Sequence, residues 1–153
     1  MATTVIAEDL TVTVTESYTL NGVNYGNTMN KTFTSNGEVI QRIMTIAAQS
    51  RGSAWTNIIN FGAADAAGVA DITNYKYFRI KNLDNTNFLE LRVTGTADSF
   101  FVKIKAGETF LLMDNEIDAA ASSTTVGTLT DITQIGANAN TDAIDIEFIA
   151  VTA

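Results

Sequence analysis

The chain has 153 residues, which fits a single domain over residues 1–153, and its hydrophobic fraction of 46% is too high for a disordered protein. It contains no Cys and no His, which excludes disulfides, thiol chemistry and the Ser–His, Cys–His and zinc mechanisms of most hydrolases. Its net charge of −8 argues against nucleic acid and against an anionic membrane surface as partners. We therefore expect a non-enzyme that needs no cofactor.

The first residues show no targeting signal. Residues 1–10 have neither the basic start nor the apolar stretch of a secretion leader, and no apolar run approaches the roughly 20 residues of a membrane span. We expect the product to fold in the cytoplasm. Residues 1–9 precede the first strand-like segment and are compatible with a flexible N-terminal arm.

The first predicted element is a β-hairpin. Thr11–Thr15 alternates Thr and Val without interruption, which is typical of a strand with one buried face. Asn21-Gly22 then separates it from Val23–Tyr25, and Asn-Gly is the strongest short hairpin signal because both residues tolerate a positive φ. Lys31–Thr34 is expected to continue the return strand, and Asn36-Gly37 gives a second tight turn.

The next segment, Glu38–Ala48, is compatible with a helical stripe or with a strand, and its β-branched residues favour the strand. Trp55–Phe61 is another apolar strand candidate. The Ala-, Gly- and Asp-rich stretch Gly62–Gly68 indicates a loop.

The middle of the chain has the clearest pattern, in which apolar residues alternate with polar or charged ones. It predicts four consecutive antiparallel strands that pair in chain order, at Tyr75–Leu83, Phe88–Val93, Phe100–Ile104 and Thr109–Met113. Short polar or Gly-containing turns separate them.

After Asp114 the pattern weakens. Ala119–Thr125 and Gly136–Thr141 are predicted loops, and Leu129–Ile135 and Ile144–Phe148 are predicted strands. The spacing of strands and turns predicts an all-β fold: an antiparallel β-sandwich, jelly-roll-like, with eight to ten short strands.

One predicted sheet face carries aromatic side chains between cationic ones, on the assumption that the four middle strands pair in order. Its tentative interface residues are Tyr75, Tyr77, Arg79, Lys81, Arg92, Phe101, Lys103 and Lys105, and Phe88 points the same way. This composition is enriched at protein interfaces, but a glycan or single-stranded nucleic-acid platform would look similar, as would partly covered surface.

The charges are unevenly distributed. Every Lys and Arg lies within Lys31–Arg51 or Lys76–Lys105, whereas residues 106–153 hold acidic residues and no basic one. Two interpretations stay open: acidic surface that prevents self-association, or a basic mid-chain face that meets the acidic segment of a neighbouring copy.

Two groups of carboxylates are candidate sites of chemistry. Asp114, Glu116 and Asp118 form a weak calcium candidate, since the pattern lacks the Gly and the final Glu of an EF-hand loop. Glu90, Glu108 and Glu147 offer no pair that the sequence brings to glycosidase spacing. We assign no catalytic residue and no metal site.

A resemblance adds to this picture. A strand ending in Ile80-Lys81-Asn82 is followed by a polar turn, by the alternating strand Phe88–Leu91, and then by Lys105-Ala106-Gly107-Glu108. The stretch Ile72–Met113 resembles small capsid-associated virion proteins of tailed bacteriophages, and residues 41–46 fit the upstream part of that pattern.

The resemblance implies a decoration or cement protein of the virion, made in the cytoplasm of an infected bacterium. It implies a homo-oligomer that binds neighbouring copies and other virion proteins such as the major capsid protein. The alternative function is a receptor- or glycan-binding module of a tail fibre or adhesin, with Trp55 or Tyr77 as a stacking platform.

Overall fold

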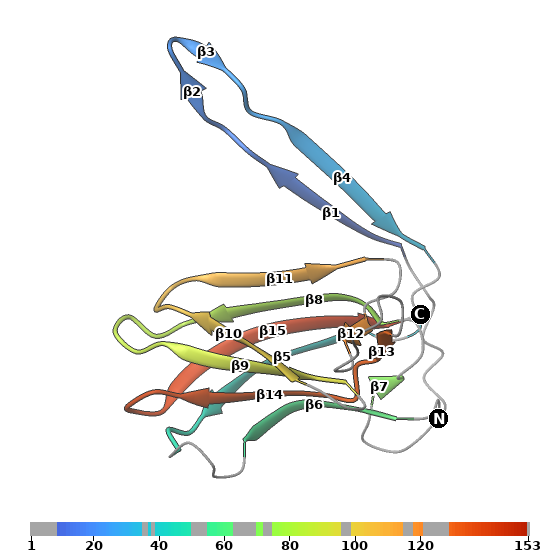
Figure 1. Cartoon of the computed structure of the whole chain (residues 1–153), viewed down its shortest axis with the longest axis vertical. Coiled ribbons are helices and arrows are strands. Elements are labelled where there is room, and N and C mark those ends of the chain that lie inside the picture. Colours follow the sequence, from blue (N-terminus) through green and yellow to red (C-terminus); the bar gives the residue numbers. More distant parts are fainter. Residues whose placement is uncertain are drawn as a thin grey trace, which may run out of the picture.

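The structure is a computed structural model that describes residues 9–34, 37, 39–49, 55–62, 70–71, 75–95, 99–114, 118–120 and 129–152. Two sheets pack face to face as a β-sandwich, and a long β-hairpin projects from one side of it (Figure 1). The hairpin, residues 10–33, is called the arm below. The prediction of an all-β, antiparallel β-sandwich is confirmed.

The sheet next to the arm is called the upper sheet, and the other the lower sheet. The upper sheet contains, in spatial order, β11 (Thr109–Met113), β8 (Tyr75–Asn82), β15 (Ile144–Thr152) and β5 (Val39–Ile46), all antiparallel. The lower sheet contains β10 (Ser99–Ile104), β9 (Leu89–Thr94), β14 (Gln134–Ala139), β6 (Thr56–Gly62) and β7 (Ala70–Asp71), of which only β7 runs parallel to its neighbour.

The remaining strands form small separate pairs. The arm contains β1 (Leu10–Thr15), β2 (Thr19–Leu20), β3 (Val23–Asn24) and β4 (Thr28–Phe33), and β12 (Asp118–Ala120) pairs with β13 (Leu129–Asp131). The described residues thus form 15 strands, more than the eight to ten predicted, because short pairs and the arm add to the two main sheets.

Alternation explains the core between the sheets. Phe78 and Ile80 of β8, Leu91 of β9, and Ile146 and Phe148 of β15 are all 0% exposed. The alternative of a helix over Glu38–Ala48 is excluded, since β5 pairs with β15 along its whole length and buries Ile46 completely. The predicted loops Gly62–Gly68 and Ala119–Thr125 lie mostly outside the described residues, as does Asn36, although Ala119 and Ala120 belong to β12.

The four middle strands do not pair in chain order, so that prediction is wrong. β8 pairs with β11 in the upper sheet, whereas β9 pairs with β10 in the lower sheet. The connection over residues 83–88 therefore carries the chain from one sheet to the other. Alternation predicts which face of each strand is buried, but either pairing would bury the same side chains.

Asn82 holds this crossing in place. It is 0% exposed, and its side-chain Nδ2 donates to the carbonyls of Asn87 (2.9 Å) and Ile104 (3.3 Å). Its Oδ1 accepts a hydrogen bond from the backbone N–H of Asp84 (3.0 Å). One amide thus links the end of β8 to the loop and to the end of β10.

Asp84 makes the loop sensitive to acid. Its carboxylate accepts hydrogen bonds from the backbone N–H groups of Thr86 and Asn87, and these bonds lower its pKa below the ordinary value. The stabilisation is present above the ordinary Asp pKa and is lost as pH falls through the lowered one. We expect Asp84→Ala to shift the thermal midpoint at pH 7 more than at the acid limit of folding; equal shifts would contradict this.

The lower sheet corrects one predicted loop. Residues 136–139 belong to β14, which lies between β9 and β6, and only the rest of Gly136–Thr141 forms a turn. Its small residues fit a crowded place: a Cβ on Gly136 would lie 3.2 Å from the Cβ of Trp55, and Ala137 is 0% exposed. The small side chains of residues 136–139 therefore reflect close packing within a strand. Their composition alone is also typical of a loop, which is why the prediction was wrong.

Candidate interaction surfaces

The arm is a two-stranded ribbon whose ladder is interrupted between Thr15 and Thr19 on one strand and between Asn24 and Thr28 on the other. Asn21 and Gly22 turn the chain with φ of 51° and 80°, which confirms the hairpin predicted from Asn-Gly. Leu10 lies opposite Phe33 at the base, and Leu20 lies opposite Val23 at the tip in the same register. Backbone hydrogen bonds from Glu16 to Asn27 (2.7 Å) and from Tyr25 to Tyr18 (3.0 Å) join the two halves. At about 3.4 Å per residue the ribbon is roughly 35 Å long.

The two faces of the arm differ in chemistry, because side chains alternate across a strand. Its polar face carries Thr11, Thr13, Thr15, Ser17 and Thr19 of the outgoing chain and Asn24, Gly26, Thr28, Asn30 and Thr32 of the returning chain. Its apolar face carries Leu10, Val12, Val14, Tyr18 and Leu20 with Val23, Tyr25, Met29 and Phe33, interrupted by Glu16, Asn27 and Lys31.

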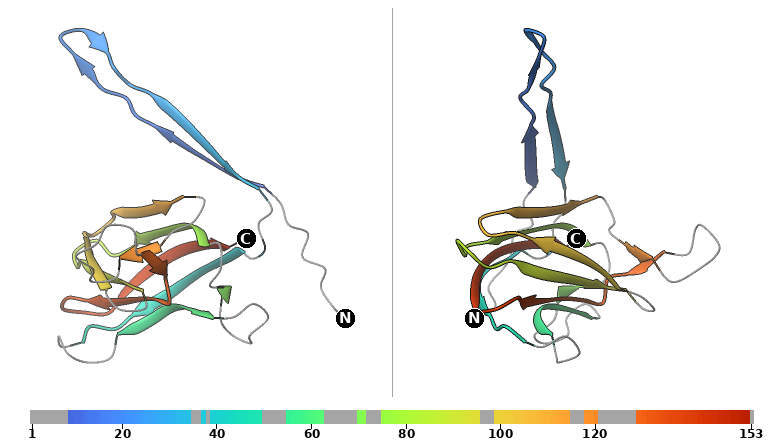
Figure 2. Two further views of the ribbon diagram at one scale, coloured as in Figure 1. Left: turned by 45° about the vertical axis from the view of Figure 1, so that its right-hand side comes forward. Right: turned by 60° about the vertical axis from the view of Figure 1, so that its left-hand side comes forward.

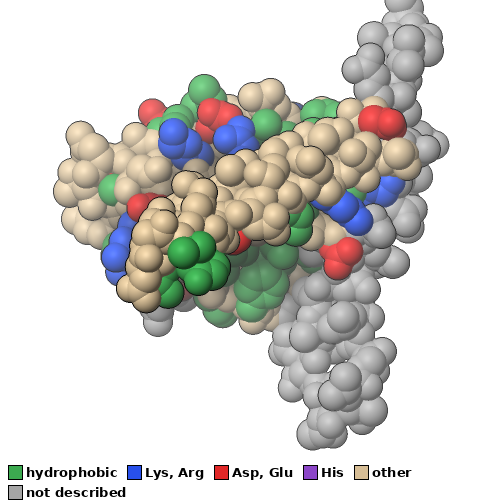
Figure 3. Space-filling model, turned by 90° about the horizontal axis from the view of Figure 1, so that it is seen from above, with side chains coloured by type: hydrophobic (Ala, Val, Ile, Leu, Met, Phe, Trp, Pro, Cys, Tyr) green, Lys and Arg blue, Asp and Glu red, His purple; other side chains and the backbone are tan. Residues whose placement is uncertain are grey.

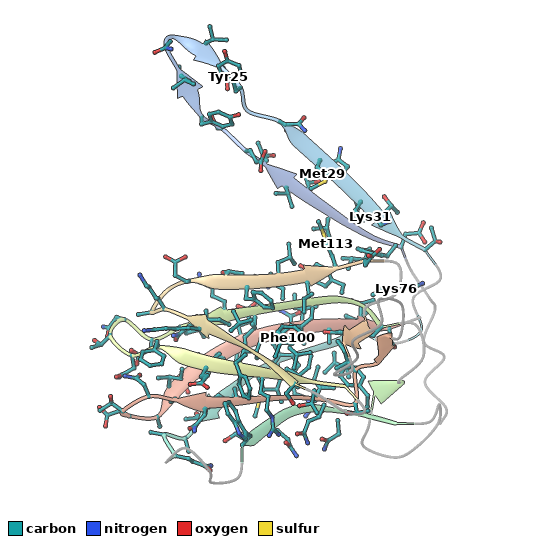
Figure 4. The ribbon with its side chains drawn as sticks, in the orientation of Figure 1. Tyr25, Met29, Lys31, Lys76, Phe100 and Met113 are labelled. Carbon is teal, nitrogen blue, oxygen red and sulfur yellow. The ribbon has the colours of Figure 1, made fainter. Side chains whose placement is uncertain are left out.

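The base of the arm packs on the outer face of the upper sheet. Phe33 is 2% exposed, and its ring centroid lies 6.4 Å from that of Tyr77 on β8. These two side chains and Val151 form a second buried cluster, distinct from the core between the sheets. Leu10, Val12, Leu111, Met113 and Ile149 pack around it. Met113 lies between β11 and the arm (Figure 4).

None of the described residues covers the outer half of the arm in this way. Tyr18, Leu20, Val23, Tyr25 and Met29 are between 52% and 58% exposed. The arm leaves the body at an angle in both views of Figure 2, and Figure 3 shows hydrophobic side chains gathered at its end. The rings of Tyr18 and Tyr25 stack at 5.9 Å with an interplanar angle of 17°. An apolar strip of this kind on a projecting ribbon indicates a contact surface.

The outer face of the upper sheet is mixed. Arg79 of β8 donates to Glu147 of β15 at 2.6 Å, and both side chains are about one-quarter to one-third exposed (30% and 26%). At the far edge, Val39 and Ile43 of β5 are 65% and 69% exposed. The basic mid-chain segment and the acidic C-terminal segment therefore meet inside one chain. Arg79 and Glu147 therefore neutralise each other within one chain, although the sequence had also allowed such pairs to form between neighbouring copies.

The outer face of the lower sheet carries an aromatic patch, defined as Trp55, Arg92 and Phe101. The rings of Trp55 and Phe101 lie 5.6 Å apart, and the Arg92 guanidinium lies 5.1 Å from the Trp55 ring centroid. Arg92 also donates to Gln134 at 2.6 Å, which fixes its plane. Nearby, Lys103 lies over the ring of Phe88 at 3.9 Å.

The predicted interface residues thus do not share one face. Arg79 and Lys81 lie on the outer face of the upper sheet, whereas Arg92, Phe101 and Lys103 lie on the opposite side of the sandwich. Lys105 is exposed in the turn after β10. The prediction of a single aromatic–cationic face is wrong because it assumed that the four strands share a sheet.

The two tyrosines of that prediction are buried. Tyr77 does point outward from β8, but the arm covers it and leaves it 7% exposed, so it offers no stacking platform. Burial raises the pKa of its phenol, and Arg79 opposes that rise. Tyr75 is 2% exposed, and its ring centroid lies 4.9 Å from that of Phe61 in the lower sheet.

Tyr75 provides a test of this burial. Its hydroxyl has no hydrogen-bond partner among the described atoms, and burial raises its pKa well above the ordinary value. Since an unpaired buried hydroxyl costs stability, we expect Tyr75→Phe to leave the free energy of unfolding unchanged or to raise it by up to about 1 kcal/mol. Tyr77→Phe, which loses the contact with Arg79, serves as the comparison in urea unfolding. A loss above about 1 kcal/mol for Tyr75→Phe would show that the hydroxyl is bonded.

The carboxylate candidates are not assembled into a site by the described residues. Glu147 pairs with Arg79 on the upper sheet, Glu90 lies on the outer face of the lower sheet, and Glu108 is exposed in a turn. Glu116 and the side chain of Asp118 fall outside the described residues, so the calcium prediction is untested. Across the described ranges, no three Asp, Glu, Cys or His side chains form a group suited to a metal ion. No helix in these ranges is long and apolar enough to cross a bilayer.

Sequence reasoning missed the arm as a surface. It identified the hairpin and its turn, but it treated these residues as part of the sandwich. The signal was present: the Thr-rich positions of the outgoing strand are matched by Thr28, Asn30 and Thr32 on the return, so one whole face lacks apolar residues.

The fold and these surfaces define a class, an all-β sandwich with a projecting amphipathic arm. No protein-family model matches the chain, and no curated protein or solved structure matches it either.

Proposed function

We propose that the chain is a structural protein of a tailed-phage virion, most specifically a decoration or cement protein that binds the head lattice and neighbouring copies, and that it catalyses no reaction. The observation that carries the proposal is the arm, which presents an apolar strip more than half exposed at a distance from a self-sufficient core. Such an element can reach a neighbouring subunit.

The order of strands supports a jelly roll. Apart from β7, eight strands form the two main sheets and are counted in chain order: β5, β6, β8, β9, β10, β11, β14 and β15. In the upper sheet the spatial order is first, eighth, third and sixth (β5, β15, β8, β11). In the lower sheet it is second, seventh, fourth and fifth (β6, β14, β9, β10). We infer a jelly-roll topology from this alternation. Jelly rolls occur in viral capsid proteins and in lectins, so the fold is compatible with both proposed functions.

The mechanism would be burial of apolar surface against protein partners. An exposed strip of Tyr, Leu, Val and Met gains from leaving water, and aromatic residues are frequent among the side chains that dominate binding energy. The acidic net charge of −8 keeps free copies soluble before they assemble.

The test is localisation. Antibodies raised against the purified protein are applied to particles released from the bacterial culture that carries the gene, and gold labelling is viewed by electron microscopy. We expect labelling over the heads of tailed particles. Labelling at a tail tip would support the alternative function, and absence of label from every particle would contradict both.

One observation favours the alternative of a glycan- or receptor-binding module. The aromatic patch holds the ring of Trp55 beside Phe101 and below Arg92, and aromatic rings with a fixed polar neighbour can stack on sugars. A glycan array separates the two functions. If the alternative holds, the intact protein binds a defined set of sugars and Trp55→Ala abolishes the signal, whereas Tyr25→Ala, on the arm, leaves it unchanged.

A further inference from the structure

The apolar face of the arm fits a surface that the chain itself carries. We infer that the outer half of the arm of one copy packs across the β5 side of the upper sheet of a second copy, with residues Val39, Gln41 and Ile43 as the receiving strip. This inference rests on the proposed function, since it names how copies of an assembling protein bind one another.

The first step is continuity with a contact already made. The inner part of the same arm face, Leu10, Val12 and Phe33, packs on the upper sheet of its own chain around Tyr77 and Val151. The arm face and the outer face of this sheet are therefore complementary kinds of surface. The arm then diverges from the body (Figures 1 and 4). Its outer apolar residues are more than half exposed.

The second step is the uncovered part of the receiving sheet. β5 is an edge strand, and its outward side chains alternate as Val39, Gln41 and Ile43, with Val39 and Ile43 65% and 69% exposed. The arm repeats this order on its apolar face: the Val14 and Met29 rung, the polar Glu16 and Asn27 rung, then the Tyr18 and Tyr25 rung. On both surfaces, neighbouring outward residues are two positions apart, or about 6.8 Å, so the apolar, polar and apolar positions of one can lie against those of the other.

The third step is charge. The whole chain carries a net charge of −8, so two copies repel least where they meet through strips with few charges. Residues 10–33 contain two charged residues, Glu16 in the outer part and Lys31 opposite Val12 in the inner part, so the outer part of the arm carries one charge. The outward side chains of β5 described above carry no charge at all. A nucleic acid or an anionic membrane would require clustered cations, and the arm has one, Lys31; a strip with few charges suits contact with a second acidic copy.

The fourth step is area. The part of the ribbon from the Val14 and Met29 rung to the Asn21-Gly22 turn presents a face of about 25 Å by about 10 Å, or roughly 250 Å², which is too little for a specific interface by itself. If each copy places its arm on the other, two arm faces and two receiving surfaces are buried, and the total reaches at most about 1,000 Å², near the lower limit for a specific contact. The area therefore favours a reciprocal exchange between two copies, in which each residue contact occurs twice.

The absence of Cys from the sequence makes the test direct, because introduced thiols are the only ones present. Asn27→Cys places a thiol on the apolar face of the arm, and Gln41→Cys places one on the receiving strip; neither removes an apolar side chain. The two variants, one labelled with ¹⁵N, are mixed as full-length protein and treated with a short bismaleimide. Linked peptides are identified by mass, and the isotope label shows that they come from different copies.

We expect the pair of Asn27→Cys with Gln41→Cys to link at least tenfold more than the pair of Asn30→Cys with Gln41→Cys. Asn30 lies on the polar face of the same ribbon and, like Asn27, is exposed, so it is the matched control. Equal yields from the two pairs, or no link between copies for either, would overturn the inference. Circular dichroism of each variant shows whether its sandwich is intact. If no such link forms but gold label is found on particles, the inference about the arm is overturned and the proposed function stands. If the link forms but no particle is labelled, the inference stands and the proposed function is contradicted.

Discussion

Replacing Phe148 with alanine is expected to lower the free energy of unfolding by about 3–5 kcal/mol, as for other fully buried phenylalanines. Phe148 is 0% exposed in β15, which lies between β8 and β5, and its ring centroid is 6.3 Å from that of Phe78. The truncation removes a large apolar group and leaves a cavity that the strands on either side prevent from collapsing. Urea unfolding followed by circular dichroism measures the loss.

Phe101→Ala is the matched control for this prediction. Phe101 belongs to the edge strand β10 and is 55% exposed, so its truncation should cost no more than about 1 kcal/mol. Similar losses for the two variants would mean that β15 is not the centre of the upper sheet.

Replacing Asn82 with alanine is expected to cost about 2–4 kcal/mol, although the residue is polar. The change leaves the carbonyls of Asn87 and Ile104 and the N–H of Asp84 without their present partner, at a fully buried position. Unpaired polar groups that are shielded from water lose their hydration without compensation. The same urea experiment measures this loss.

Asn85→Ala tests whether the effect belongs to Asn82 or to the loop in general. Asn85 lies in the same crossing, is exposed, and accepts a hydrogen bond only from the neighbouring Thr86 hydroxyl among the described contacts. Its substitution should change stability by less than about 0.5 kcal/mol. If Asn82→Ala were equally mild, the amide would not be what joins the two sheets at this point.

The sequence predicted the elements better than their arrangement. The strict alternation in β8, β9 and β15 and the Asn21-Gly22 turn were sufficient to locate strands and the hairpin, because these signals are local. Pairing is not local. The crossing at residues 83–88 moves the chain to the other sheet. It is held by hydrogen bonds of Asn82 and Asp84, which alternation does not report.

The candidate surfaces were predictable only in part. Arg79, Arg92 and Phe101 do point away from the core, as predicted, but the crossing separates them onto opposite faces. Predicting that the arm is an exposed surface would have required knowing where the sandwich ends. The sandwich covers Leu10 and Phe33, whereas Tyr18 and Tyr25, which belong to the same alternating pattern, extend beyond it. Alternation describes an amphipathic ribbon equally well whether its apolar face is buried or free.

The central claim is that the chain acts by associating through the apolar face of its arm. Light scattering of the purified full-length protein over a range of concentrations tests it, together with the variant Tyr18→Ser/Tyr25→Ser, which makes the outer part of that face polar. We predict that the intact chain reaches at least twice the monomer mass, and that the variant stays monomeric at concentrations at least tenfold higher while its circular dichroism is unchanged. An intact chain that remains monomeric throughout, or a variant that associates as readily as the intact chain, would contradict the account.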